Sequence, residues 1–296
     1  MKVFVTGATG FIGTAIVQEL INAGHQVLGL ARSEASAQKL ITAGAEAHRG
    51  DLEDLESLRS GAAAADGVIH AGFVHDFSRL QEICQIDKIA IETIGDVLAG
   101  SNRPFIVASG AALVSPGKLA TEDIKPPVSP GWPRASEQTA DEVAAKGVRA
   151  AAIRLSPSVH GDEDNHGFIS ILMNIARDKG VSAYIGEGNN RWNAVHRLDA
   201  ARLFRLALEN AEPTARYHGV AEEAISFKSI AEAIGKELNL PAVSISPEAA
   251  AEHFGWFAHM AAIDCPTSSE WTRRTLDWQP THSTLLEDIK NGIYTK

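Results

Sequence analysis

Cysteine is scarce in this chain of 296 residues, which contains only Cys84 and Cys265. Neither belongs to a CxxC pair or stands beside a cluster of metal-ligating residues, so neither a disulfide scaffold nor a structural zinc site is indicated. A reducing compartment is expected, and we predict a cytoplasmic protein. The opening MKVFVTGATG passes straight into a predicted strand and a glycine turn, which leaves no room for a secretory signal peptide.

Long hydrophobic runs and basic runs are missing as well. No apolar stretch reaches the roughly 18 residues that a membrane-spanning helix requires. The formal net charge is −10, whereas a nucleic-acid-binding protein needs a concentrated positive surface. These absences argue against membrane and nucleic-acid partners. We expect a small-molecule substrate as the partner, and a monomer or a homodimer as the assembly.

The first half of the chain alternates short β-rich runs with helical periodicity. This alternation predicts an α/β protein with a Rossmann-type, doubly wound parallel sheet and right-handed crossovers. Beyond residue 155 the pattern weakens, and a smaller C-terminal α/β lobe is expected. Strands are predicted at 2–6, 26–30, 45–49, 67–71, 104–109 and 148–155, and helices at 14–23, 35–43, 52–58, 79–98, 135–146, 168–178, 200–210, 229–238 and 247–254.

A glycine motif lies between the first strand and the first helix. Gly7 permits a tight turn, Gly10 lets the backbone approach a pyrophosphate, and Gly13 lets the helix pack closely on the strand. The free N–H groups of the helix N-terminus can then bind the phosphates. We therefore predict a dinucleotide site whose contacts in this turn are Gly7, Thr9, Gly10, Phe11, Ile12 and Gly13.

This turn resembles the TGxxGxxG motif of the short-chain dehydrogenase/reductase superfamily, in its extended, epimerase/dehydratase-like branch. The resemblance covers roughly residues 1–210 and implies an NAD(P)-binding Rossmann domain over 1–155. It implies a mainly substrate-binding lobe over 156–296, with about 192–210 returning to pack on the first domain. It also implies that Asp51 meets the adenine, that Leu52 beside it is a further cofactor contact, and that Ala71 and Gly72 lie near the nicotinamide ribose. The matching segments are 6–13, 50–52, 70–72, 154–161 and 192–201.

The end of the second predicted strand distinguishes the two possible cofactors. An acid here would bind the ribose 2′-hydroxyl of NAD, but the chain has Ala31 followed by Arg32 and Ser33. A guanidinium can pair with the 2′-phosphate of NADP. We therefore predict NADP, with NAD as the alternative. In that alternative Arg32 is a solvated loop charge, and Glu34 is a bystander or a ribose ligand.

The chain departs from the superfamily at the catalytic Tyr-xxx-Lys pair. Aligning the helix predicted at 135–146 with the family places Pro133 at the tyrosine position and Glu137 at the lysine position. The family's Ser/Thr falls on Gly110, with Ser109 next to it. No tyrosine occurs between residues 1 and 183. This combination resembles atypical subgroups of the superfamily, whose members are generally of undefined activity.

Another proton donor is then needed if the protein is an enzyme. The catalytic candidates are His75, Ser109 and His160, because histidine titrates near neutral pH and Ser109 is near the family's hydroxyl position; Ser109 is also a predicted cofactor contact. For each histidine alone, a structural or surface role is the more frequent alternative. The predicted substrate pocket comprises His75, Asp76, Phe168, Trp192 and His196, where the two aromatic side chains could instead be lobe packing. The acidic string at 162–166 lacks the spacing of a calcium or zinc site, so no metal is expected.

Three functions are compatible with this pattern. The first is an NADP-dependent oxidoreductase that reduces a small carbonyl compound or an activated alkene. The second is a non-catalytic sensor of NADP redox state, motivated by the missing pair. The third is an epimerase or dehydratase, which ranks lower because that chemistry usually relies on the same tyrosine.

Overall fold

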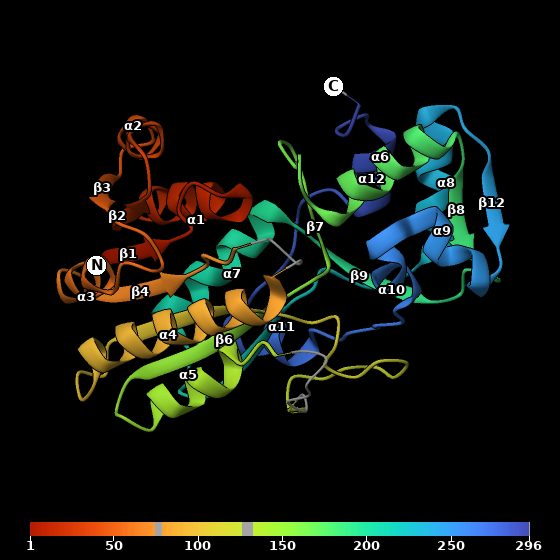
Figure 1. Ribbon diagram of the computed structural model, residues 1–296. Coiled ribbons are helices and arrows are strands. Elements are labelled where there is room, and N and C mark those ends of the chain that lie inside the picture. The colour runs from red at the N-terminus through yellow and green to blue at the C-terminus, as the bar shows by residue number, and fades with distance from the viewer. Residues whose placement is uncertain (75–78, 126–132, 296) are drawn as a thin grey trace.

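The computed structural model describes residues 1–74, 79–125 and 133–295, which form two lobes (Figure 1). The first lobe is built on a parallel sheet with the strand order β10-β6-β5-β4-β1-β2-β3. The order reverses between β1 and β4, the switch point where sheets of this kind have their ligand-binding crevice, at the carboxyl ends of the strands. The strands are β1 Lys2–Thr6, β2 Gln26–Ala31, β3 Glu46–Arg49, β4 Gly67–His70, β5 Pro104–Gly110, β6 Arg149–Leu155 and β10 Arg216–Gly219.

Helices cover both faces of this sheet, as the buried, apolar character of its strands requires. One face packs against α3 (Leu55–Ala63), α4 (Leu80–Leu98) and α5 (Ser136–Ala144) through a core that includes Phe4, Ile91 and Phe105. The other face packs against α1 (Phe11–Asn22), α2 (Glu34–Thr42) and α7 (Arg197–Asn210). The Rossmann α/β architecture is therefore confirmed.

Two of the differences from the sequence-based expectation bear on how the first lobe is built. Helix α3 begins at Leu55 rather than at 52, because the side chain of Asp54 accepts a hydrogen bond from the backbone N–H of Ser57 and caps the helix there. Strand β10 was not expected. It joins the edge of the large sheet next to β6, so a segment beyond residue 210 also completes the first lobe.

The second lobe contains a three-stranded and a two-stranded sheet among the described residues. Its core is aromatic, with the fully buried Trp192 packed against Phe227 and Phe257. Strand β9 joins the lobes, since Trp192 enters this core while Val195 enters the core of the first lobe. The elements are β7 Ser158–His160, α6 Phe168–Lys179, β8 Ser182–Ile185, β9 Arg191–His196, β11 Glu222–Ser226, α8 Phe227–Leu238, β12 Ala242–Ile245, η2 Pro247–Ala249, α9 Ala250–Phe254, η3 Gly255–Phe257, α10 Ala258–Ala262 and α12 Leu285–Lys290.

The C-terminal segment crosses back to the first lobe. Helix α11 (Glu270–Leu276) leads to Trp278, whose ring is fully buried in the core beside α7. The indole Nε1 donates to the carbonyl oxygen of Asp199 at 2.9 Å, and the Asp199 carboxylate accepts from the backbone N–H groups of Thr281 and His282. None of the helices described has the length and apolar character to cross a membrane.

The burial of Trp278 in the core of the first lobe leads to a prediction about stability. Replacing this buried ring with alanine should lower the free energy of unfolding by about 3–5 kcal/mol, through lost burial and a residual cavity. The matched control is Trp256→Ala, since Trp256 is 63% exposed, and its effect should stay within about 0.5 kcal/mol. Urea unfolding of both variants checks this, and equal effects would show that the segment does not anchor the lobe.

Candidate functional site

The glycine turn has geometry that only glycine allows at two positions. Gly7 has φ +68°, and a Cβ there would lie 2.7 Å from the backbone of Ala71 and Gly72. A Cβ on Gly13 would lie 1.9 Å from the carbonyl oxygen of Gly7. The turn therefore passes directly against the end of β4, and α1 packs directly against the turn.

The outer side of the same turn is open and suits a phosphate. Gly10 is exposed and is the N-cap of α1, with no side-chain hydrogen bond to the helix end. A Cβ at Gly10 would meet only the carbonyl oxygen of Gly7, at 3.3 Å. Thr9, Phe11 and Ile12 beside it are partly exposed. Free N–H groups and the helix dipole favour an anion here, so the residues fit a dinucleotide pyrophosphate.

The end of β4 lies beside the glycine turn. We call these two segments together, residues 7–13 and 70–72, the cradle. The N–H of Gly72 donates to the Thr6 hydroxyl at 3.2 Å. A Cβ on Gly72 would approach the Leu52 side chain at 3.3 Å, so Leu52 lies directly against this strand end. The structure thus brings Gly7, Ala71, Gly72 and Leu52 together, although they come from three separate connections.

The end of β2 carries an exposed positive charge. Arg32 is 76% exposed at its side chain, and its Nε lies 3.9 Å from Oδ2 of Asp51. Ser33 caps α2 by accepting from the N–H of Ser36 at 3.1 Å. Glu34 is paired with Arg49. The guanidinium of Arg32 is thus placed next to Asp51 and is accessible to a ligand.

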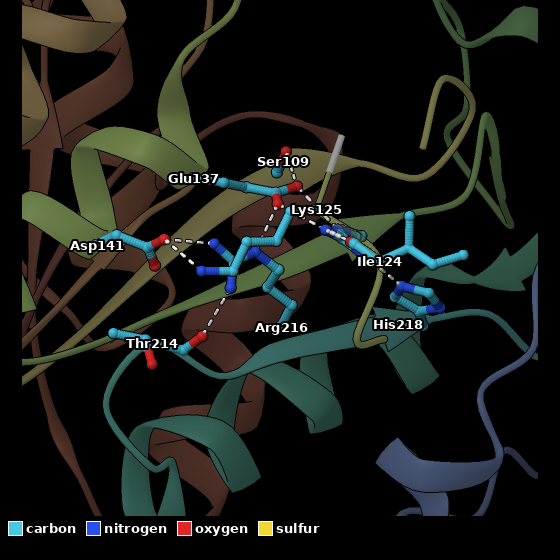
Figure 2. Close-up of polar contacts among 9 residues, drawn as sticks. Ser109, Ile124, Lys125, Glu137, Asp141, Thr214, Arg216 and His218 are labelled. Atoms are coloured by element: carbon cyan, nitrogen blue, oxygen red, sulfur yellow. Dashed lines mark hydrogen bonds and ion pairs between the residues drawn. The ribbon is translucent and has the colours of Figure 1, made fainter. Parts of the chain in front are cut away.

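Helix α5 carries a buried carboxylate where the family would have its lysine (Figure 2). Glu137 is 4% exposed. Its Oε1 accepts from Arg154 Nε at 2.9 Å, and its Oε2 accepts from Arg154 Nη2 at 2.8 Å, which makes a bidentate pair. Arg216 Nε donates to Oε2 at 3.0 Å, and its Nη2 donates to Asp141. The carboxylate therefore links α5 to β6 and β10.

The electrostatics of this cluster keep Glu137 ionised. Burial raises the pKa of the Glu137 carboxyl, but the hydrogen bonds and charge of Arg154, the Ser109 hydrogen bond and the charge of Arg216 hold it below its ordinary value. Ser109 donates its hydroxyl proton to Glu137 Oε1 at 2.9 Å. The hydroxyl that we considered for catalysis thus serves here as a hydrogen-bond donor to a structural anion.

His218 completes the cluster on the side of β10. Its Nε2 lies 3.0 Å from Arg154 Nη1, and its Nδ1 lies 2.6 Å from the carbonyl oxygen of Ser268. Burial lowers the pKa of His218. A neutral ring fits both contacts, because Nε2 then accepts from the guanidinium while Nδ1–H donates to the carbonyl.

A buried series of hydrogen-bonded side chains begins at Thr6, beside the cradle. Thr6 Oγ1 lies 2.9 Å from His70 Nδ1, and His70 Nε2 lies 3.2 Å from Asp87 Oδ1 on α4. Ser136, at the start of α5, donates to Asp87 Oδ2 at 2.5 Å. Burial raises the pKa of the Asp87 carboxyl, but the hydrogen bonds with His70 and Ser136 and the charge of Arg134 outweigh that effect and lower it.

Arg134 is the last member of this hydrogen-bonded series and lies at the carboxyl edge of the sheet. Its Nε donates to the Ser136 hydroxyl at 2.9 Å, and its Nη2 donates to the carbonyl oxygen of Ala108 at 2.9 Å. The guanidinium carbon lies 4.1 Å from the centre of the Phe73 ring. Arg134 therefore stands between the end of β5 and the segment that follows β4.

Three histidines of the C-terminal half, His160, His196 and His282, lie together near Asp288 of α12, and the first two are buried. His160 is 1% exposed, and its Nδ1 lies 2.6 Å from Asp288 Oδ2. The His196 ring meets the His160 ring edge to face at 5.4 Å between centroids and stacks on His282 at 4.8 Å. Burial, followed by the charge of His160, lowers the pKa of His196 to about 4. The structure therefore holds His160 in the interior rather than at the surface of the crevice.

The other predicted pocket residues lie apart from the cradle. Phe168 packs on Trp192 at 6.0 Å between ring centroids, and both belong to the core of the second lobe. Trp192 has no exposed surface. His75 and Asp76 fall outside the described residues. In the described ranges, no group of three or more His, Cys, Asp or Glu side chains is arranged to hold a metal ion.

Sequence reasoning missed Arg134, Asp87 and the partners of Glu137. One signal was present, since Arg154 interrupts the apolar strand Arg149–Leu155. A charge in a strand buried on both faces needs a buried counterion. Arg134 offered no comparable signal, because two of its neighbours, Phe73 and Ala108, come from distant parts of the chain.

The Glu137 cluster generates the second prediction. Glu137→Gln leaves two buried guanidinium groups without their carboxylate and should cost about 3–5 kcal/mol of unfolding free energy at neutral pH. Because the folded pKa is lowered, this stabilisation is fully present above the unfolded pKa of about 4.3 and is lost as the pH falls through the folded value. The difference between the variant and the wild type should therefore shrink in acid.

Urea unfolding at pH 7 and in acid measures this difference. Asp141→Asn is the matched control, because Asp141 contacts the same Arg216 but is 30% exposed at its side chain. Its cost should be about 1 kcal/mol or less. A Glu137→Gln protein as stable as the wild type at pH 7 would refute a structural role for the carboxylate.

Comparisons with known proteins agree with this geometry. The model of the NAD dependent epimerase/dehydratase family matches residues 3–219. An uncharacterised protein of Schizosaccharomyces pombe is 52% identical over 295 residues, covering 99% of this chain and all of its own. The sterol-4-alpha-carboxylate 3-dehydrogenase, decarboxylating, of Dictyostelium discoideum is 28% identical over 244 residues, covering 77% of this chain and 73% of its own.

A solved structure shares the fold of both lobes. The dTDP-glucose 4,6-dehydratase DesIV of Streptomyces venezuelae, with NAD bound, superposes with a TM-score of 0.78 at 16% identity, covering 99% of this chain and 96% of its own. The glycine turn, the sheet order and these matches lead to one conclusion: the chain belongs to the NAD dependent epimerase/dehydratase family, within the short-chain dehydrogenase/reductase class.

Proposed function

We propose that the protein is an NADP-dependent oxidoreductase that reduces a small carbonyl compound or an activated alkene. The observation that carries the proposal is the open glycine turn at Gly10, where the uncapped N-terminus of α1 faces the crevice at the ends of β1 and β4. A reduced nicotinamide dinucleotide bound there supplies a hydride. The residues of the chain bind it and orient a substrate.

The preference for NADP rests on Arg32. Its guanidinium is exposed at the end of β2, where the strand finishes on Ala31 and offers no acid to a ribose 2′-hydroxyl. Glu34, the acid that follows, is paired with Arg49. A 2′-phosphate fits this arrangement, and NAD, which DesIV holds, is the alternative cofactor.

The residues at the two positions of the family's Tyr-xxx-Lys pair favour reduction over epimerisation or dehydration. Pro133 has no ionisable group, and the Glu137 carboxylate is held by two arginines. A simple reduction needs a polarised carbonyl and a proton, which water can supply, whereas the other reactions need an acid–base residue at this place. The Dictyostelium relative is named as a dehydrogenase, which agrees with this class. The free, buried Cys84 and Cys265 suit the reducing cytoplasm.

A panel of aldehydes, ketones and enones tests the activity. With NADPH present, at least one class should be reduced, seen as loss of nicotinamide absorbance with formation of the alcohol or saturated product. Tight binding of NADPH with no oxidation by any class would overturn the reductase proposal and favour a sensor of NADP redox state. A sensor would bind the oxidised and reduced forms with different affinities.

Arg32→Ala tests the cofactor preference. Loss of a charge-assisted contact with the 2′-phosphate should weaken NADP binding about tenfold or more, while the affinity for NAD should stay unchanged. Arg49→Ala is the control, because Arg49 lies on the neighbouring strand and is already paired. Calorimetric titration with both dinucleotides gives the two affinities, and an equal loss for NAD and NADP would contradict the assignment.

A further inference from the structure

Arg134 stands next to the position where the family's catalytic tyrosine would be expected. It follows Pro133 directly and precedes the start of α5 at Ser136. Its guanidinium reaches the end of β5 through the Ala108 carbonyl and covers the Phe73 ring after β4. The ends of these two strands flank the crevice on the side where a Rossmann sheet holds the nicotinamide half of a dinucleotide.

The side chain is held in place before any ligand binds. Nε is bonded to Ser136, Nη2 is bonded to Ala108, and the Phe73 ring supports the guanidinium plane at 4.1 Å. The contacts come from the start of α5, from β5 and from the segment that follows β4. A ligand that binds Arg134 would therefore not have to restrict a mobile side chain.

The partners of Arg134 in the described ranges, Ser136, the Ala108 carbonyl and the Phe73 ring, are neutral. Arg154 and Arg216 both pair directly with Glu137. In contrast, Arg134 is half-buried and forms no ion pair with any carboxylate among residues 1–74, 79–125 and 133–295. The Asp87 carboxylate reaches it only through the Ser136 hydroxyl. Nη1 of Arg134 has no hydrogen-bond partner in these ranges.

We propose that Arg134 binds a carboxylate of the substrate, so that the protein acts on small oxo acids. This inference deepens the proposed reductase function and rests on it for the reaction, but not for the binding. Guanidinium groups bind carboxylates strongly through charge-assisted hydrogen bonds, and the partly buried position strengthens the attraction.

The proposed reduction of an oxo acid needs only the reduced cofactor as hydride donor and water as proton donor. The carbonyl carbon accepts a hydride from the reduced cofactor, and the C=O π pair moves to the oxygen. That oxygen takes a proton from water, so the oxo acid becomes a hydroxy acid, hydroxide remains, and the cofactor leaves oxidised. Arg134 anchors the carboxylate and stabilises the negative charge that develops on the neighbouring oxygen.

Binding to the complex with oxidised NADP tests the site without turnover. Pyruvate, 2-oxobutanoate and acetoacetate are each compared with their methyl esters by calorimetry. At least one acid should bind about tenfold or more tightly than its ester. Arg134→Gln should abolish this preference with unchanged NADP affinity, and Arg134→Lys should keep part of it.

Arg103→Gln is the matched control. Arg103 is also a half-buried arginine bonded to backbone carbonyls, of Ala62, Ala65 and Val97, but it lies at the opposite end of β5. This variant should keep the preference for acids over esters. Thermal unfolding of each variant with NADP bound shows whether it is folded, and Arg134→Lys carries the test if the glutamine variant does not fold.

The outcomes separate this inference from the proposed function. Equal binding of acids and esters by the wild type, a preference that survives Arg134→Gln, or no binding of any probe overturns the carboxylate site. Acids that bind through Arg134 but are never reduced by NADPH support the site and overturn the reductase. Equal reduction of acids and esters, unaffected in Arg134→Gln, supports the reductase and overturns the site.

Discussion

The buried pairing of Glu137 with Arg154 and Arg216 is the interaction on which the rest of the site depends. Arg154 comes from β6 and Arg216 from β10, so the two cations approach each other inside one edge of the sheet. The carboxylate between them offsets their repulsion and their burial, because an unpaired charge in the protein interior costs several kcal/mol of folding free energy. Glu137 therefore positions α5 against β6 and β10, and the start of α5 in turn positions Ser136 and Arg134.

This constraint changes the chemistry that the crevice can perform. The lysine position of the family's catalytic pair holds an anion that serves the fold, and the tyrosine position holds Pro133. The hydroxyl of Ser109 donates to the same anion. Among the described residues, a path of hydrogen bonds near the crevice runs from Gly72 and Thr6 through His70, Asp87 and Ser136 to Arg134, where it ends in a half-buried cation. The open turn at Gly10 supports the proposed function, and the end of this path at Arg134 supports the proposed carboxylate site.

The sequence was sufficient to predict the fold and the turn, because both depend on local patterns. Alternating periodicities specify the sheet and its helices, and Gly7 and Gly13 occupy positions that exclude a Cβ. It was insufficient for the site chemistry, which depends on contacts between distant segments. Arg134 meets Phe73 and Ala108 only after the sheet has formed, and Glu137 finds Arg216 across 79 positions of the chain. His160 lies in the segment 154–161 that resembles the superfamily, yet α12 brings Asp288 against it, and the side chain is buried.

The ionisation state of Glu137 tests the central claim most directly. Carbon-13 NMR of the labelled side-chain carboxyl, assigned with Glu137→Gln and followed from pH 8 into acid, reports that state in the folded protein. The pairing with two arginines predicts an ionised carboxylate throughout the neutral range, with no titration above the ordinary glutamate value of about 4.3. A carboxyl that takes up its proton between pH 5 and 7 would contradict the account, because a neutral Glu137 would be available for proton transfer and could not balance the two buried guanidinium groups.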